Sequence, residues 1–302
     1  MKKIYKLVNQ IKNYEWGSPS FIPQFLNINN SEKKPYAEMW MGTHRGAPSK
    51  AEDNGSLVSL ENIAGELPFL FKLIAVEKTL SIQVHPDKSQ AAEGFERENK
   101  AGISLDDPVR CYKDANMKNE IICAITPFTL MAGFKDTGDF DVCSPLCYNS
   151  VTLAQGQAIF IPCGIPHSYK SGFGIELMNN SDNVIRGGLT NKHVDLNEFK
   201  KIVKTNRFTP DIITPDSNSQ FNYSIPCGDF SLSLIRGSKG ALNIRQGEPA
   251  IGIVTEGELQ IDNMCFRKGE SFFISGDNSQ LRLDGVFSLF IASKSFALNK
   301  PE

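Results

Sequence analysis

Two separated segments carry side chains of the kind that hold a metal ion. In residues 79–85 polar and apolar residues alternate, so Gln83 and His85 face the same side of a predicted strand. Residues 156–167 are typical of a strand, a tight turn and a histidine, His167, after the turn. A hairpin whose histidine caps a loop would explain the second segment alone. Together, the segments predict three N/O groups that a small barrel could bring to one point.

A divalent ion would also need an anionic ligand, and Glu120 is the best candidate. It opens an apolar strand at the end of residues 116–120, although the pattern equally fits a solvated strand end. The set Gln, His, Glu, His contains no thiol, which suits zinc with an open position and also admits manganese, iron or cobalt.

Composition narrows the class of protein. The 302 residues carry a formal charge of -2, which gives no general attraction for nucleic acid. No apolar run could span a bilayer, so we expect no membrane partner and a cytoplasmic location. The seven cysteines are odd in number and scattered, which indicates reduced thiols.

Most segments predict short strands separated by Asn, Asp, Gly and Pro clusters. Residues 69–75 and 121–125 are apolar runs too short for typical helices. Residues 86–100, capped by Asp87 or Ser89, and residues 195–203 predict helices. The fold class is therefore mainly β, with jelly-roll barrels and a short helical excursion.

Residues 209–219 form a polar, proline-marked linker, which places a domain boundary there. We predict a catalytic domain over 1–208, with a helical segment at about 86–119, and a linker plus degenerate second barrel over 209–302. Residues 269–275 repeat the rhythm of 156–162, but Gln280 stands where His167 would be. All four histidines precede the linker, so the chemistry is expected in the first domain.

Five motifs, in order, resemble the type I mannose-6-phosphate isomerases, a double-cupin family. The motifs are residues 14–18, 37–44, 80–86, 161–169 and 181–190. The glycine, proline and histidine spacing of 156–167 also resembles the second cupin motif. The resemblance implies a zinc-dependent isomerase that interconverts mannose 6-phosphate and fructose 6-phosphate, with one zinc per chain. It implies a sugar phosphate as the partner and a monomer or weak homodimer.

By motif match, the family's zinc ligands fall on the four residues found above: Gln83, His85, Glu120 and His167. Its arginine falls on Arg186 and its lysine on Lys118. The reaction moves a proton between C2 and C1 through a cis-enediolate, so a base and positive charge are needed. Lys118 could act as the base or hold phosphate, and Glu176 is a rival base; Arg186 offers a fixed charge.

Five further residues are candidate substrate contacts. Ser81 and Lys72 could bind phosphate or hydroxyls, and Tyr169 shares the face of His167. Trp16 and His44 could line the pocket, although a core role explains each as well.

One motif departs from the family's usual Asn-His-Lys-Pro-Glu. This chain has Met117 and Asn119 at the histidine and proline positions. Losing the proline could loosen the approach to Glu120. The departure motivates a rival function, a cupin that binds a sugar phosphate without converting it. A metal-dependent oxygenase is a second rival, and the Arg186 motif argues against it.

Overall fold

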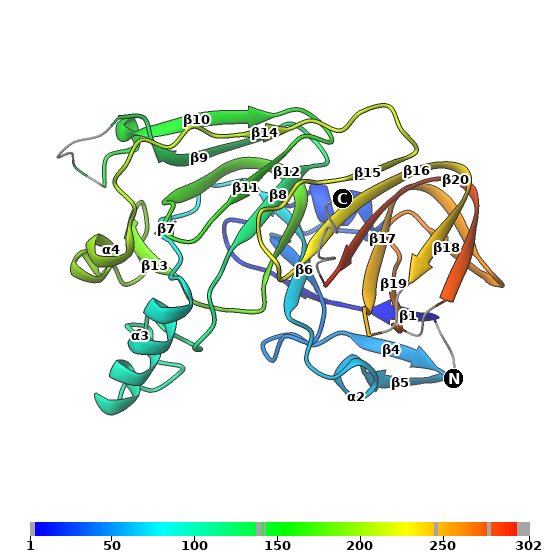
Figure 1. The fold of residues 1–302 in the computed structure, drawn as a ribbon, viewed down its shortest axis with the longest axis horizontal. Coiled ribbons are helices and arrows are strands. Elements are labelled where there is room, and N and C mark those ends of the chain that lie inside the picture. The colour runs from blue at the N-terminus through cyan, green and yellow to red at the C-terminus, as the bar shows by residue number, and fades with distance from the viewer. Residues whose placement is uncertain (1–3, 137–140, 142, 245–246, 277–278, 295–302) are drawn as a thin grey trace, which may run out of the picture. The chain divides into compact units, whose positions relative to one another are not determined.

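The computed structural model describes residues 4–136, 141, 143–244, 247–276 and 279–294. It confirms a mainly β fold made of antiparallel strands with few helices (Figure 1). The strands of residues 4–134 are β1 (Ile4–Val8), β2 (Gln10–Lys12), β3 (Glu38–Met41), β4 (Lys50–Asp53), β5 (Ser56–Ser59), β6 (Phe69–Val76), β7 (Ile82–Val84), β8 (Glu120–Ala124) and β9 (Phe128–Phe134). The later strands are β10 (Tyr148–Leu153), β11 (Ala158–Ile161), β12 (His167–Asn179), β13 (Ile185–Gly188), β14 (Ile212–Ile213), β15 (Gln220–Asn222), β16 (Ser231–Ile244), β17 (Ala250–Ile261), β18 (Met264–Arg267), β19 (Ser271–Ile274) and β20 (Ser279–Ser293). The helices are α1 (Phe21–Phe25), α2 (Leu60–Ala64), α3 (Lys88–Lys100), the 3-10 turn η1 (Pro145–Cys147) and α4 (Leu196–Ile202).

The chain divides into two compact units, which we call the terminal unit and the central unit. The described parts of 1–14, 19–73 and 215–302 form the terminal unit, and 15–18 with 74–214 form the central unit. The change at 214 lies within the predicted linker. The start of the chain differs from the predicted division, because β1 pairs with β19 and β4 and so belongs with the C-terminal strands.

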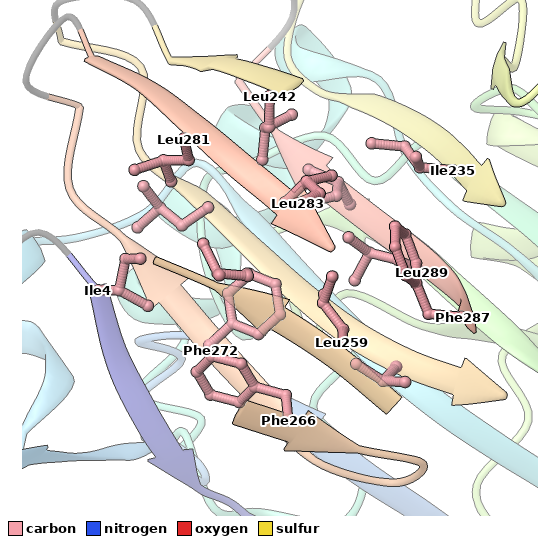
Figure 2. Packing of buried hydrophobic residues seen from close by; sticks show 14 of the residues in the cluster. Ile4, Ile235, Leu242, Leu259, Phe266, Phe272, Leu281, Leu283, Phe287 and Leu289 are labelled. Atoms are coloured by element: carbon pink, nitrogen blue, oxygen red, sulfur yellow. The ribbon is translucent and has the colours of Figure 1, made fainter. Parts of the chain in front are cut away.

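Within the terminal unit, β2 pairs with β3. The main sheet of this unit is antiparallel. Its hydrogen-bonded order is β15-β16-β20-β17-β19-β1-β4-β5, and β18 pairs with β17. A cluster of buried apolar side chains packs on this sheet: Phe266 and Phe272 lie with their ring centroids 4.6 Å apart, and Leu281 and Leu283 of β20 point toward the same interior (Figure 2). Gln280, directly before Leu281, is exposed and donates to Asn243.

The central unit is organised around the long strand β12. The first half of β12 pairs with β9 and, at His167, with β7, whereas its second half pairs with β8. β11 pairs with the other edge of β8, and β13 pairs with the other edge of β7. The two halves therefore belong to two sheets that enclose one core, which includes Ile122, Leu130 and Tyr169.

Gly172 allows β12 to pass from one sheet to the other. Its φ is +130°, and a Cβ there would lie 2.7 Å from the Phe128 Cα and from the Pro127 carbonyl oxygen. Only glycine fits this backbone and this close approach. The bend lets His167 and Glu176, at opposite ends of one strand, border the same interior.

The predicted helix between the His85 and Glu120 strands is α3. Asp87 is its N-cap: the carboxylate accepts from the Gln90 N–H, and the Gln90 side chain accepts from the Asp87 N–H, which completes a capping box. The predicted helical segment to 119 is too long. The helix ends at Lys100, where Gly102 takes a φ of +72°, and residues 101–119 form turns and loop.

The predicted second helix is α4, with Asp195 as its cap accepting from the Glu198 N–H. The Glu198 carboxylate accepts from Tyr112 at 2.7 Å and is paired with Arg97 at 2.6 Å. The side chain of Glu198 therefore joins α4 to α3 and to the loop that leads to the β8 strand.

Candidate metal centre

Four side chains of the central unit meet at the ends of β7, β8 and β12. His85 Nε2 lies 3.2 Å from Glu120 Oε1, and His167 Nε2 lies 3.2 Å from Glu120 Oε2. Gln83 Nε2 lies 3.3 Å from His167 Nε2. Rotation of the amide by half a turn would present its oxygen at the same place. The structure thus brings together the four ligands predicted from the sequence.

Backbone carbonyls fix both imidazole rings. His85 Nδ1 donates to the Asn183 carbonyl at 2.7 Å, and His167 Nδ1 donates to the Ile165 carbonyl at 3.1 Å. In a neutral ring the proton then sits on Nδ1, and Nε2 directs its lone pair toward Glu120. This is the arrangement of a metal-ligating histidine whose second nitrogen is oriented by a hydrogen bond.

The electrostatics of this cluster favour a bound cation. Burial, aided by the positive charge of Lys118, lowers the pKa of His85 to about 3, so its ring is neutral. The Glu120 carboxyl is buried, but Lys118, His85 and His167 outweigh that burial and hold its pKa well below its usual value. An anionic carboxylate and neutral imidazoles are the ligand states that a divalent ion requires. Two histidines, a carboxylate and an amide without sulfur fit zinc with an open position.

Lys118 is the cation nearest to the cluster. Its Nζ lies 2.8 Å from Glu120 Oε1 and 3.3 Å from His85 Nε2, and the residue is only 6% exposed. The lysine of the family motif therefore stands beside two of the four ligands.

Arg186 lies in one cross-strand row with two ligands. In the register of the three strands, Arg186 is directly opposite Gln83, and Gln83 is directly opposite His167. Directly opposed residues of antiparallel strands project to the same face. The guanidinium thus belongs to the face that holds the cluster. Burial lowers the pKa of Arg186, and the nearby Cys111 opposes that effect.

Glu176 and Tyr169 lie behind the cluster. Glu176 is opposite Ile122 on β8, two residues along the strand from Glu120 and hence on its face. The Tyr169 hydroxyl is 3.4 Å from Glu120 Oε2 and also bonds the Glu176 carboxylate. Burial and these two carboxylates raise the pKa of Tyr169 well above its ordinary value. The phenol therefore stays protonated and lies between the two carboxylates, either of which can accept its single proton.

The other predicted substrate contacts divide between the units. Ser81, half-buried, precedes Gln83 by two residues, and Trp16 packs against the core of the central unit. Lys72 and His44 belong to the terminal unit. There Lys72 is buried 3.6 Å from Glu38, and His44 Nδ1 accepts from the Gly46 N–H at 3.0 Å.

The sequence reasoning missed Asn183, which is fully buried behind His85. Besides its carbonyl contact to His85, its amide oxygen accepts from the Lys113 N–H at 2.7 Å and its amide nitrogen donates to the carbonyls of Asp114 and Asn116. Asn183 thus joins a zinc-ligand candidate to the loop that carries Lys118. Asn183 lies inside the 181–190 motif, and this position in a family motif is the sequence feature that could have identified it as a site residue.

Asn119, at the family's proline position, is anchored on both sides. Its N–H donates to Asn179 Oδ1 at 2.8 Å, and its Oδ1 accepts from the Cys163 N–H at 3.0 Å. The expectation that losing the proline loosens the approach to Glu120 is not what the structure shows, because hydrogen bonds replace the rigid ring.

Among the described residues, no helix is long and apolar enough to cross a membrane.

Comparisons with known proteins show the family of the chain. The family described as phosphomannose isomerase type I, catalytic domain, matches residues 4–137. The mannose-6-phosphate isomerase of Salmonella typhimurium is 30% identical over 382 aligned residues, covering 93% of this chain and 97% of that protein. Mannose-6-phosphate isomerase 2 of Arabidopsis thaliana is 26% identical over 406 residues, covering 91% and 90%.

Solved structures give the same result. A zinc-bound mannose 6-phosphate isomerase superposes with a TM-score of 0.87 at 29% identity, covering 98% of this chain and 100% of that one. The Salmonella typhimurium isomerase bound to fructose 6-phosphate and zinc gives a TM-score of 0.86 at the same identity and coverage. With near-complete coverage in both directions, this chain belongs to the type I phosphomannose isomerase family.

Proposed function

We propose that this chain interconverts mannose 6-phosphate and fructose 6-phosphate with one zinc ion held by Gln83, His85, Glu120 and His167. The observation that carries the proposal is the convergence of these four thiol-free ligands beside Lys118. Family membership and the fructose 6-phosphate found in a solved relative support the substrate.

The reaction exchanges a proton between C2 of the aldose and C1 of the ketose through a cis-enediolate. A proton must also move between the O1 and O2 oxygens. Zinc, when bound, supplies a Lewis acid that polarises a substrate oxygen. The protein must add a proton carrier near both carbons and a fixed positive charge for the developing enediolate.

Lys118 is the proposed proton carrier. Its Nζ is 3.3 Å or less from ligand atoms of His85 and Glu120, so a substrate held at the open metal position would lie within its reach. Arg186, on the same face as Gln83 and His167, is proposed to stabilise the enediolate charge. Its planar, permanently charged fork suits two neighbouring oxygens.

Glu176 is the alternative base. Its contact with Tyr169, which in turn reaches Glu120, favours a positioning role for both residues. Ser81 shares the ligand face and is proposed as a hydroxyl contact. Trp16, Lys72 and His44 stay candidate substrate contacts.

The testing experiment is a coupled isomerase assay on metal-free protein, before and after one equivalent of zinc. We expect fructose 6-phosphate from mannose 6-phosphate only after zinc is restored. Zinc binding without turnover, with mannose 6-phosphate still raising the thermal stability, would support the non-catalytic sugar-phosphate-binding cupin instead.

The two candidate bases can be separated by exchange of the substrate C2 proton in heavy water. Lys118→Met should abolish both turnover and exchange, and Glu176→Gln should reduce turnover while exchange persists. The reverse pattern, at equal zinc content, would assign the base to Glu176. Arg186→Ala should keep its zinc and lose about 100-fold in kcat, as expected for a group that stabilises developing charge.

A further inference from the structure

A second cluster of ligand-type side chains lies in the central unit, outside the zinc centre. We propose that Cys111, His193 and Asp195 form a separate site for a thiophilic divalent cation of the zinc and cadmium class. This site is distinct from the isomerase centre in its residues and in containing sulfur.

Two separate parts of the chain supply the ligands. Cys111 lies in the loop after α3, His193 lies between β13 and α4, and Asp195 caps α4. The Cys111 Sγ, one ring nitrogen of His193 and one carboxylate oxygen of Asp195 all lie within 4.8 Å of one another. A single ion could bridge them after side-chain adjustments well under the size of a rotamer change, since zinc bonds to S, N and O are about 2.0 to 2.3 Å long.

The ligand atoms have little other bonding to lose. Cys111 Sγ has a long contact, 3.8 Å, to the Val109 carbonyl. Asp195 uses Oδ1 to accept from the Glu198 N–H, which leaves Oδ2 for a metal. No hydrogen bond joins the exposed His193 ring to another residue of the described ranges.

The charges around the cluster suit a cation. Burial, together with the carboxylates of Glu98, Asp195 and Glu198, raises the pKa of Cys111 to about 12, against the weaker opposing charge of Arg186. The free thiol therefore carries its proton. On binding, the metal–sulfur bond forms, the S–H bond breaks, and the proton passes to water without any redox change. Cysteine, histidine and aspartate leave a fourth, tetrahedral position for water.

Occupancy would connect two segments that lead to the isomerase site. The 189–195 segment directly follows β13, which carries Arg186, and Cys111 belongs to the loop that continues to Lys118. A bound ion would fasten these segments to each other. The site therefore offers a means by which metal in excess of the catalytic zinc acts on the loops around the centre.

The sulfur makes the site separately measurable. The zinc-loaded protein is titrated with cadmium chloride, and the ultraviolet sulfur-to-cadmium charge-transfer absorption is followed with equilibrium dialysis. The four ligands of the zinc centre contain no sulfur, so cadmium exchange there gives no such absorption. We expect one saturable absorption step, weakened at least about tenfold in affinity by Cys111→Ser and by His193→Ala.

Cys143→Ser and Cys265→Ser are the matched controls, since each removes a thiol outside the cluster. We expect both to keep the absorption step. Its retention in His193→Ala, or its loss in Cys143→Ser, would overturn the proposed ligand set. His193 is exposed, so His193→Ala tests the proposed ligand set even if the buried Cys111→Ser fails to fold. The coupled isomerase assay on the same samples reports independently on the catalytic site.

Discussion

Two hairpins of this chain share a strand-turn-strand rhythm but differ in what they deliver. In the central unit, the turn after β11 leads to His167, which is buried and whose ring faces Glu120. In the terminal unit, the strand that follows β19 carries Gln280 at the matching position, and this side chain is exposed and bonded to Asn243. The same local pattern thus produces a metal ligand in one unit and a surface amide in the other.

The different interiors of the two units explain why one hairpin delivers a metal ligand and the other a surface amide. Beside Gln280, Leu281 and Leu283 point into an apolar core with Phe266 and Phe272 (Figure 2). The central unit places Glu120 and His167 on the inner face of comparable strands. A buried carboxylate is tolerated there because the positive charge of Lys118, 2.8 Å away, compensates for its desolvation. Chemistry therefore depends on a few inward polar residues that support one another, and the strand framework alone does not produce it.

The largest expected effect comes from removing the inward histidine. His167→Ala should lose most bound zinc, and turnover should fall by more than about 100-fold, beyond the loss typical of residues that only orient a ligand. Zinc by elemental analysis and rate by the coupled assay measure both. Gln280→Ala is the matched control from the other hairpin and should change neither. Full zinc and activity in His167→Ala would remove this residue from the site, and a loss in Gln280→Ala would show that the two hairpins are not functionally different.

Much of this could be predicted from the sequence. Alternation in residues 79–85 placed Gln83 and His85 on one face, and the capping residues before residues 88 and 196 marked both longer helices. Short-range patterns marked Gln83, His85 and His167 as candidate ligands, whereas the pattern around Glu120 fitted a solvated strand end equally well and only the family resemblance favoured a ligand.

What escaped prediction depends on long-range pairing. No local pattern shows that β1 pairs with β19, more than 260 residues away, so a prediction of two consecutive domains does not contain this pairing. The carbonyl of Asn183 and the two-sided anchoring of Asn119 likewise depend on segments that meet only in the folded chain. A pattern in the sequence specifies which side chains face inward, but it does not specify what supports them from behind.

The next largest effect is expected from removing the side chain that holds the backbone behind His85. Asn183→Ala should weaken zinc binding by about 10-fold to 100-fold. The substitution removes the side-chain amide that bonds to the Asp114 loop, and this bond holds the Asn183 backbone carbonyl in place against His85. Competition with a zinc chelator measures the affinity. Asn222→Ala, an exposed asparagine in the terminal unit, is the control and should leave the affinity unchanged. At saturating zinc the variant should recover most of its kcat, whereas a general folding defect would not be reversed by zinc.

A smaller effect is expected from pH on the metal-free protein. Folded His85 stays neutral down to a pKa of about 3, whereas an unfolded histidine takes up a proton below about 6.5. Between these values the unfolded state binds more protons, so the free energy of unfolding falls as the pH falls, by up to about 1.4 kcal/mol per pH unit. Glu120, whose pKa is also lowered, acts in the same direction through the acidic range. Urea unfolding from pH 7 to pH 5 should show a shallower decline in His85→Gln than in the unmodified chain. Equal slopes would mean that His85 takes up its proton at the same pH in the folded chain as in the unfolded chain.

The smallest effect on the zinc centre is expected at Asn119, which directly precedes β8 and the ligand candidate Glu120. Asn119→Pro restores the family's usual residue but removes the N–H that donates to Asn179 and the oxygen that accepts from Cys163. We expect a loss of about 1–3 kcal/mol in the free energy of unfolding, since buried partners are left unsatisfied, with zinc content retained. Asn119→Ala keeps the N–H and loses only the side-chain bond, so it should lose less. Urea unfolding of the two variants separates the contributions. If Asn119→Pro were as stable as the parent chain, the proline ring and the asparagine hydrogen bonds would be equivalent ways to hold Glu120; if it is less stable, the rest of this strand end has adapted to asparagine.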